Sequence, residues 1–236
     1  MTADTADTAD TAALARVTEA IEAGEPVAWA ELPPARGYEY VLPDSWFALD
    51  PSPKRSQREI QRVLDARIRR FPELDPHRKT LARLLRAQVN EAVKQDVRRI
   101  AMLSEPVDGR LVSASLLVQY AKGIPTQEDG VYDNDVESLA AFFAVNIPPD
   151  QDAGAPRDVG IVALPQQDVL RVQATTIAVD DRTGAEARGI GVQYFAPAPG
   201  ADDVLILTFN TPNVDMSEPL VLLFDMIAQT FHWTWD

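Results

Sequence analysis

The sequence predicts an α+β protein in which helices flank an antiparallel sheet of about six or seven strands. Its composition, with 236 residues of which 46% are hydrophobic and 25% charged, is typical of a chain that buries a core. Apolar residues recur at helical spacing in some segments, whereas others are short apolar runs bounded by turn residues. Because most of these runs follow one another through short turns, neighbouring strands are expected to pair antiparallel.

The N-terminal part carries no sheet signal. Residues 1–12 hold a low-complexity repeat, TADTADTADTA, and are predicted to be disordered. In residues 13–37, Leu14, Val17 and Ile21 have helical spacing and Gly24 stands at a C-cap position, which predicts a short helix and a linker. Residues 38–236 are predicted to form a single α+β domain that opens with a strand over residues 38–42.

Two helices are expected next, as an enlarged insertion after the first strand. Ser56 and Glu59 have the spacing of a capping box, and Pro72 ends the first helix. Asp75 and Pro76 give a second start signal, and the apolar stripe that follows extends to Val93.

The rest of the chain alternates between strand and helix signals. The predicted strands are residues 98–105, 110–121, 157–165, 169–179, 188–199 and 203–212, and the predicted helices are residues 134–145 and 218–231. Gly189 and Gly191 lack the third glycine of a dinucleotide-binding loop and are interpreted as strand glycines at a bulge or close backbone approach. The acidic run at residues 128–137 is interpreted as a solvated loop with Asp133 or Asp135 near a helix start.

Two motifs resemble a known fold. The segment LPDSW at residues 42–46, and LTFNTP at residues 207–212 followed by an apolar helix, resemble the PsbP-like fold of Ran-binding Mog proteins, photosystem accessory proteins and LpqN-type actinobacterial lipoproteins. The chain resembles more closely an uncharacterised actinobacterial family, through residues 42–50, 104–118 and 199–233. These resemblances imply a PsbP-like architecture and an accessory role, and no reaction.

Reactive groups are scarce. The chain has no cysteine and two histidines, which excludes disulfides and thiolate nucleophiles and argues against a histidine metal site. Asp44 and Ser45 could be combined with the histidines into a hydrolase triad, but Ser45 lies in no nucleophile motif. We therefore expect no enzyme activity, no cofactor and no metal.

The charge is unevenly distributed. A net charge of -14 argues against nucleic-acid and anionic-membrane binding, yet residues 50–100 hold 14 basic and 7 acidic residues. We expect a basic helical face that binds an acidic partner protein or supports self-association; its candidate residues are Arg55, Arg58, Arg62, Arg69, Arg83 and Arg86. A solvated face whose charges pair internally is the alternative.

The C-terminal aromatic residues supply a second candidate contact. Trp233 and Trp235 are two residues apart and could anchor a partner, or could complete the core. The predicted function is therefore a non-enzymatic binding or scaffold protein. The alternative is a carrier of a small apolar ligand in a pocket between the sheet and the helices of residues 56–97. Without a leader-like start or an apolar run of about 20 residues, a cytoplasmic location is expected.

Overall fold

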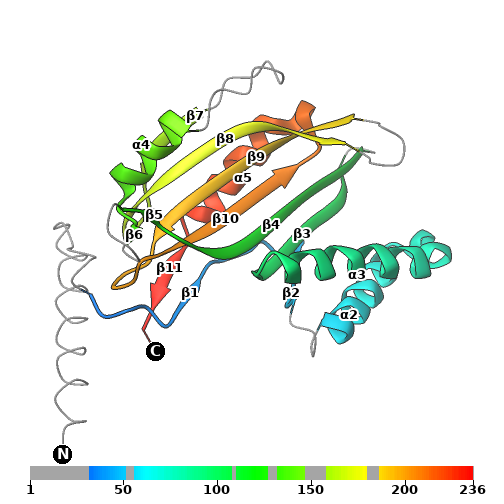
Figure 1. Cartoon of the computed structure of the whole chain (residues 1–236). Helices are drawn as coiled ribbons and strands as arrows, with labels where there is room; N and C mark the ends of the chain where they lie inside the picture. The colour runs from blue at the N-terminus through cyan, green and yellow to red at the C-terminus, as the bar shows by residue number, and fades with distance from the viewer. Residues whose placement is uncertain are drawn as a thin grey trace, which may run out of the picture.

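A seven-stranded sheet organises the chain. The computed structural model describes residues 32–51, 56–107, 110–126, 132–146, 158–179 and 186–235. The sheet has the order β2-β3-β4-β10-β9-β8-β7, and every neighbouring pair is antiparallel (Figure 1). Its strands are β2 (Trp46–Leu49), β3 (Val97–Val107), β4 (Arg110–Lys122), β7 (Asp158–Ala163), β8 (Asp168–Val179), β9 (Glu186–Pro197) and β10 (Asp203–Thr211).

The other elements surround this sheet. The described helices are α2 (Ser56–Arg70), α3 (Arg78–Lys94), α4 (Val136–Asn146) and α5 (Ser217–Ala228), with 3₁₀ turns at Pro72–His77 and Val214–Met216. Two further strand pairs are β1 (Gly37–Glu39) with β11 (His232–Thr234), and β5 (Ile124–Pro125) with β6 (Tyr132–Asp133). The predicted fold class is confirmed. The predicted repeat at 1–12, and the start of the predicted helix and linker at 13–37, lie outside the described residues.

The predicted first strand was misplaced. Residues 38–42 do not enter the main sheet; the strand that does is β2, at Trp46–Leu49. After Pro43, residues 44 and 45 form a turn in which the Trp46 amide donates to the Pro43 carbonyl over 2.9 Å. The chain before this turn pairs instead with the C-terminal strand β11.

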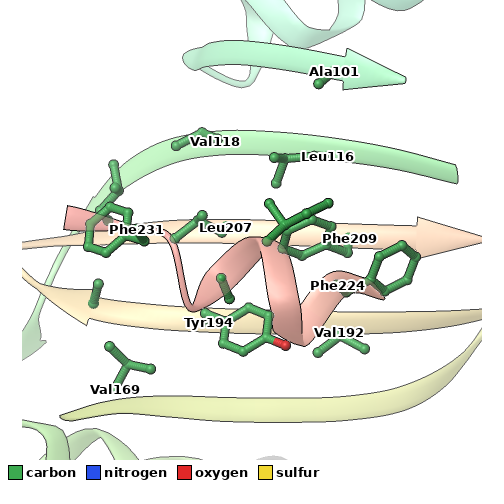
Figure 2. Packing of buried hydrophobic residues seen from close by; sticks show 14 of the residues in the cluster. Ala101, Leu116, Val118, Val169, Val192, Tyr194, Leu207, Phe209, Phe224 and Phe231 are labelled. Carbon is green, nitrogen blue, oxygen red and sulfur yellow. The ribbon is translucent and has the colours of Figure 1, made fainter. Parts of the chain in front are cut away.

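One face of the sheet holds the largest core. Side chains alternate between the two faces along each strand, and Leu207 of β10 points to this side. The aromatic rings of Phe209 and Phe224 stack with centroids 4.9 Å apart, and Trp46 meets each of them edge to face (Figure 2 labels the two phenylalanines). Helix α5 therefore covers this face.

A polar clamp fixes α5 to the same face. Arg171 of β8 donates from Nε to Oδ1 of Asp225 over 2.8 Å, and the Tyr194 hydroxyl donates to the same carboxylate. Burial, reinforced by the hydrogen bond to Asp225, raises the pKa of the Tyr194 phenol. Tyr194 therefore keeps its proton, and the three side chains form a structural network.

The opposite face carries the remaining described helices. Helix α4 packs through Val136 and Leu139 on Phe195 and Ile206, near one edge of the sheet. Helices α2 and α3 form a separate cluster with the strands at the other edge, and its buried members are Leu49, Ile60, Val63, Leu64, Ala82, Val89, Ala92, Val97 and Ile100. The two helices predicted as an insertion are thus a packed layer of their own beside β2 and β3.

The strand glycines occupy positions where the backbone approaches a neighbour. A Cβ atom on Gly189 would come within 2.7 Å of the Thr211 carbonyl oxygen, so a larger residue would force the strands apart. This confirms the interpretation of Gly189 as a site of close approach.

Among the described helices, none is long and apolar enough to cross a membrane.

Candidate functional site

Helix α2 presents arginines to solvent on the side away from its core contacts. Arg58, Arg62 and Arg69 are exposed and stand four and seven residues apart, which places them along one side of the helix. The buried positions Ile60 and Leu64 face the sheet and α3. The predicted basic face is therefore present on α2 for these three residues, whereas Arg55 lies outside the described residues.

Helix α3 adds a second basic row. Lys79, Arg83 and Arg86 are exposed and recur at intervals of four and three residues. Ala82 and Val89 of the same helix are buried in the cluster with α2. Packing of the two helices therefore determines which basic side chains remain outside.

These exposed arginines have no acidic partner within the described ranges. Arg58, Arg62, Arg69, Arg83 and Arg86 form no ion pair with any described residue. Internal pairing, the alternative considered from the sequence, is seen elsewhere: Arg78 pairs with Asp65 and Asp75. The row of arginines is thus available for an external anion as far as the described part of the chain is concerned.

A cavity opens beside this basic face, between β2 and α2. Its volume is about 410 Å³, within the range of small-ligand pockets. The lining residues are Asp44, Ser45, Trp46, Phe47, Ala48, Arg62, Val63, Ala66, Arg67 and Arg70. The cavity lies between sheet and helix, where the carrier alternative expects one, but its wall contains three arginines and is not wholly apolar.

Arg67 is the most firmly held of the three cavity arginines. Its side chain is 15% exposed, and its guanidinium lies 4.8 Å from the centre of the Phe47 ring. Its Nη2 donates to the Ser45 carbonyl over 3.3 Å. Burial lowers the pKa of Arg67, while the nearby Glu105 carboxylate opposes that effect. Arginine keeps its charge despite such a shift, so the cavity holds a fixed cation.

Glu105 of β3 joins two of the arginines. Its Oε1 atom is 2.6 Å from Nη1 of Arg70 and 3.7 Å from Nη1 of Arg67. This oxygen is buried and receives no aligned hydrogen bond from a described residue, so the contacts are ion pairs. One carboxylate thus faces two guanidinium groups.

Sequence reasoning missed Arg67, Arg70 and Glu105. On α2, Arg67 is seven residues from Ile60 and therefore lies within the apolar stripe, and this position was the available signal. The partnership with Glu105 could not be found in the sequence, because it depends on how α2 lies against β3.

The two C-terminal tryptophans have structural contacts. Trp233 is 2% exposed and packs on Phe231 within the main core. Trp235 is partly buried, and its Nε1 donates to the Pro33 carbonyl over 2.9 Å. Trp233 therefore has almost no surface to offer a partner, and the structure supports the core-packing alternative for it.

The acidic run contributes a helix cap. The Asp135 carboxylate accepts a hydrogen bond from the Ser138 amide over 2.9 Å at the start of α4. A hydrogen bond with Asp133, together with those from Ser138, lowers the pKa of Asp135 to about 2. Within the described ranges, no three histidine or acidic side chains are grouped so as to hold a metal ion.

Comparison with solved structures shows a similarity of low identity to a protein involved in mycobacterial cell envelope biogenesis. No family model and no curated protein matches the chain. A crystal structure of LpqN, described as involved in cell envelope biogenesis of Mycobacterium tuberculosis, aligns with a TM-score of 0.40 and 13% identity over 84% of this chain and 86% of LpqN. These values do not establish the PsbP-like assignment, which stays a prediction from the sequence motifs.

Proposed function

We propose that this chain is a non-enzymatic binding protein that docks an acidic region of a partner protein on the exposed basic face of α2 and α3. The observation that carries the proposal is the set of exposed arginines without acidic partners in the described structure: Arg58, Arg62, Arg69, Arg83 and Arg86. Basic side chains that are not neutralised internally keep their attraction for an external anion.

The charge of the rest of the molecule supports an oriented encounter. Residues 50–100 carry 14 of the 22 basic residues and 7 of the 36 acidic residues, so the remainder is strongly acidic. An acidic partner is repelled by most of the surface and attracted to α2 and α3. The expected consequence is fast, salt-sensitive association through one face.

The experiment compares two variants of equal charge. In the first, Arg58, Arg69 and Arg83, none of which lines the cavity, are each replaced by Glu; in the control, Arg98, Arg110 and Arg188, which are exposed but lie on the strands, are replaced in the same way. Tagged wild type and both variants are used to recover partners from cells of the source organism at low and at moderate salt.

Partners that use the basic face are expected with the wild type and the control, and absent with the α2–α3 variant. Moderate salt should release them from the wild type, because exposed charge pairs are screened within about 10 Å at 0.1 M salt. Retention of every partner by the α2–α3 variant, with unchanged salt sensitivity, would show that the docking face is wrong.

A further inference from the structure

The cavity between β2 and α2 combines an anchored cation with an apolar wall. Its basic lining residues are Arg62, Arg67 and Arg70 of α2. Phe47, Ala48, Val63 and Ala66 supply carbon surface. Such a pairing suits a molecule with two unlike ends, because the guanidinium groups favour an oxyanion while the apolar wall favours a hydrocarbon body.

The charges of the lining do not cancel. Glu105 is one carboxylate shared between Arg67 and Arg70, and Arg62 pairs with no described acidic residue. Asp44, the acidic lining residue, is exposed, so solvent screens its charge more strongly than that of the nearly buried Arg67. Three guanidinium groups against the Glu105 and Asp44 carboxylates leave the site with one net positive charge.

The geometry of Arg67 is set before any ligand arrives. The Phe47 ring, the Ser45 carbonyl and the Glu105 carboxylate hold the guanidinium from three directions. An anion that binds here does not have to immobilise a flexible side chain, which reduces the entropic cost of binding.

The strand edge contributes polar groups to the same cavity. Strand β2 is the last strand in the order of the sheet and pairs only with β3 among the described strands. In an antiparallel ladder, alternate residues of such an edge strand direct their N–H and C=O groups away from the partner. Phe47 and Ala48 of this strand are lining residues.

We propose that the cavity between β2 and α2 binds a small amphiphilic organic anion, whose carboxylate or phosphate group pairs with Arg67 and Arg62 and whose apolar body lies against Phe47, Val63 and Ala66. The ligand class follows from charge, volume and lining, and it does not depend on the proposed protein partner. It also sharpens the carrier alternative, which expected a purely apolar ligand.

The test uses octanoate as the probe, with 1-octanol and inorganic phosphate as matched comparisons that each lack one end. Binding to the full chain is measured by isothermal titration calorimetry. We expect octanoate to bind at least about tenfold more tightly than either comparison. Equal binding of 1-octanol would overturn the anionic contact, and equal binding of inorganic phosphate would overturn the apolar one.

Two cavity variants and one control locate the site. Arg67→Met removes the fixed charge, and Ala66→Trp fills the cavity without changing any charge. Arg188→Met, at an exposed position of β9 that does not touch the lining, serves as the control. Octanoate binding should weaken at least about tenfold in both cavity variants and stay unchanged in the control.

The second cavity variant keeps the test decisive if Arg67→Met is poorly folded. Thermal melting of each variant shows whether the fold is retained. Unchanged octanoate affinity in folded Ala66→Trp would overturn the proposal, as would an absence of octanoate binding by the wild type. Neither result would bear on the partner-recovery experiment, because that experiment changes the charge of the exposed basic face of α2 and α3 and not that of the cavity.

Discussion

Glu105 is the residue whose replacement gives the sharpest prediction about the cavity. Glu105→Gln keeps the size and shape of the side chain but removes its charge. The carboxylate is 16% exposed and lies 2.6 Å from Arg70 and 3.7 Å from Arg67. Its loss leaves Arg67, which is 15% exposed, without its acidic partner in the described structure.

The expected cost lies between two known limits. Exposed ion pairs contribute about 0–1 kcal/mol, and removal of one partner from a fully buried pair costs about 3–5 kcal/mol. Arg67 is nearly buried, whereas Arg70 is 59% exposed and can turn to solvent. We therefore expect Glu105→Gln to lower the free energy of unfolding by about 2 kcal/mol, which for a chain of this length lowers Tm by roughly 4–8 °C.

The assay is urea and thermal denaturation near neutral pH, run as a double-mutant cycle. Glu105→Gln, Arg67→Met and the double variant are compared with the wild type. The double variant should be less destabilised than the sum of the two single variants, since the coupling of charged neighbours is about 0.5–3 kcal/mol. A Tm of Glu105→Gln equal to that of the wild type, or strictly additive effects, would show that Glu105 does not stabilise Arg67.

Three further predictions concern stability. Phe209→Ala should lower the free energy of unfolding by about 3–5 kcal/mol, because Phe209 is fully buried. Phe142 on α4 is 39% exposed, so Phe142→Ala should lower it by less than about 1 kcal/mol; urea denaturation of both variants compares the two values. Burial raises the pKa of Tyr194, so the protonated phenol stabilises the fold fully below about pH 10, and this stabilisation is lost as the pH rises further. In denaturation curves, Tyr194→Phe should therefore have a lower free energy of unfolding than the wild type at neutral pH, and should lose less of it above about pH 10. Asp135→Ala should lower the free energy of unfolding by about 1 kcal/mol, because the cap of α4 is lost. Since the pKa of Asp135 is lowered to about 2, the difference in Tm from the wild type should be full above about pH 4 and shrink as the pH falls toward 2. Equal melts of Asp135→Ala and wild type at neutral pH would refute the cap.

Local patterns predicted much of the fold because helix periodicity and strand runs are local properties. The pattern of Leu220, Phe224 and Ile227 predicted α5, and these residues are buried as expected. The exception is the first strand, where residues 38–42 have strand character. Strand character alone does not determine a partner: β1 pairs with β11, and the short β2 after the turn enters the sheet because Trp46 and Leu49 find buried positions there.

The candidate site was only partly accessible to sequence reasoning. Exposed arginines at helical spacing, such as Arg58 and Arg62, follow from periodicity alone. The carrier alternative expected a pocket between the sheet and the helices α2 and α3, but the arginines in its lining could not be predicted, because they depend on how α2 packs beside β2. The contact of Arg67 with Glu105 joins residues 38 positions apart in the sequence and depends on the same packing.

Hydrogen exchange of the complex with a recovered partner shows whether α2 and α3 form the docking face. Partner binding should slow amide exchange in α2 and α3, and raising the salt should remove this protection in parallel with binding. Exchange in α5, on the opposite face of the sheet, should stay unchanged (Figure 1). Protection confined to α5 or to the C-terminal strand, with α2 and α3 exchanging as in the free protein, would contradict the claim.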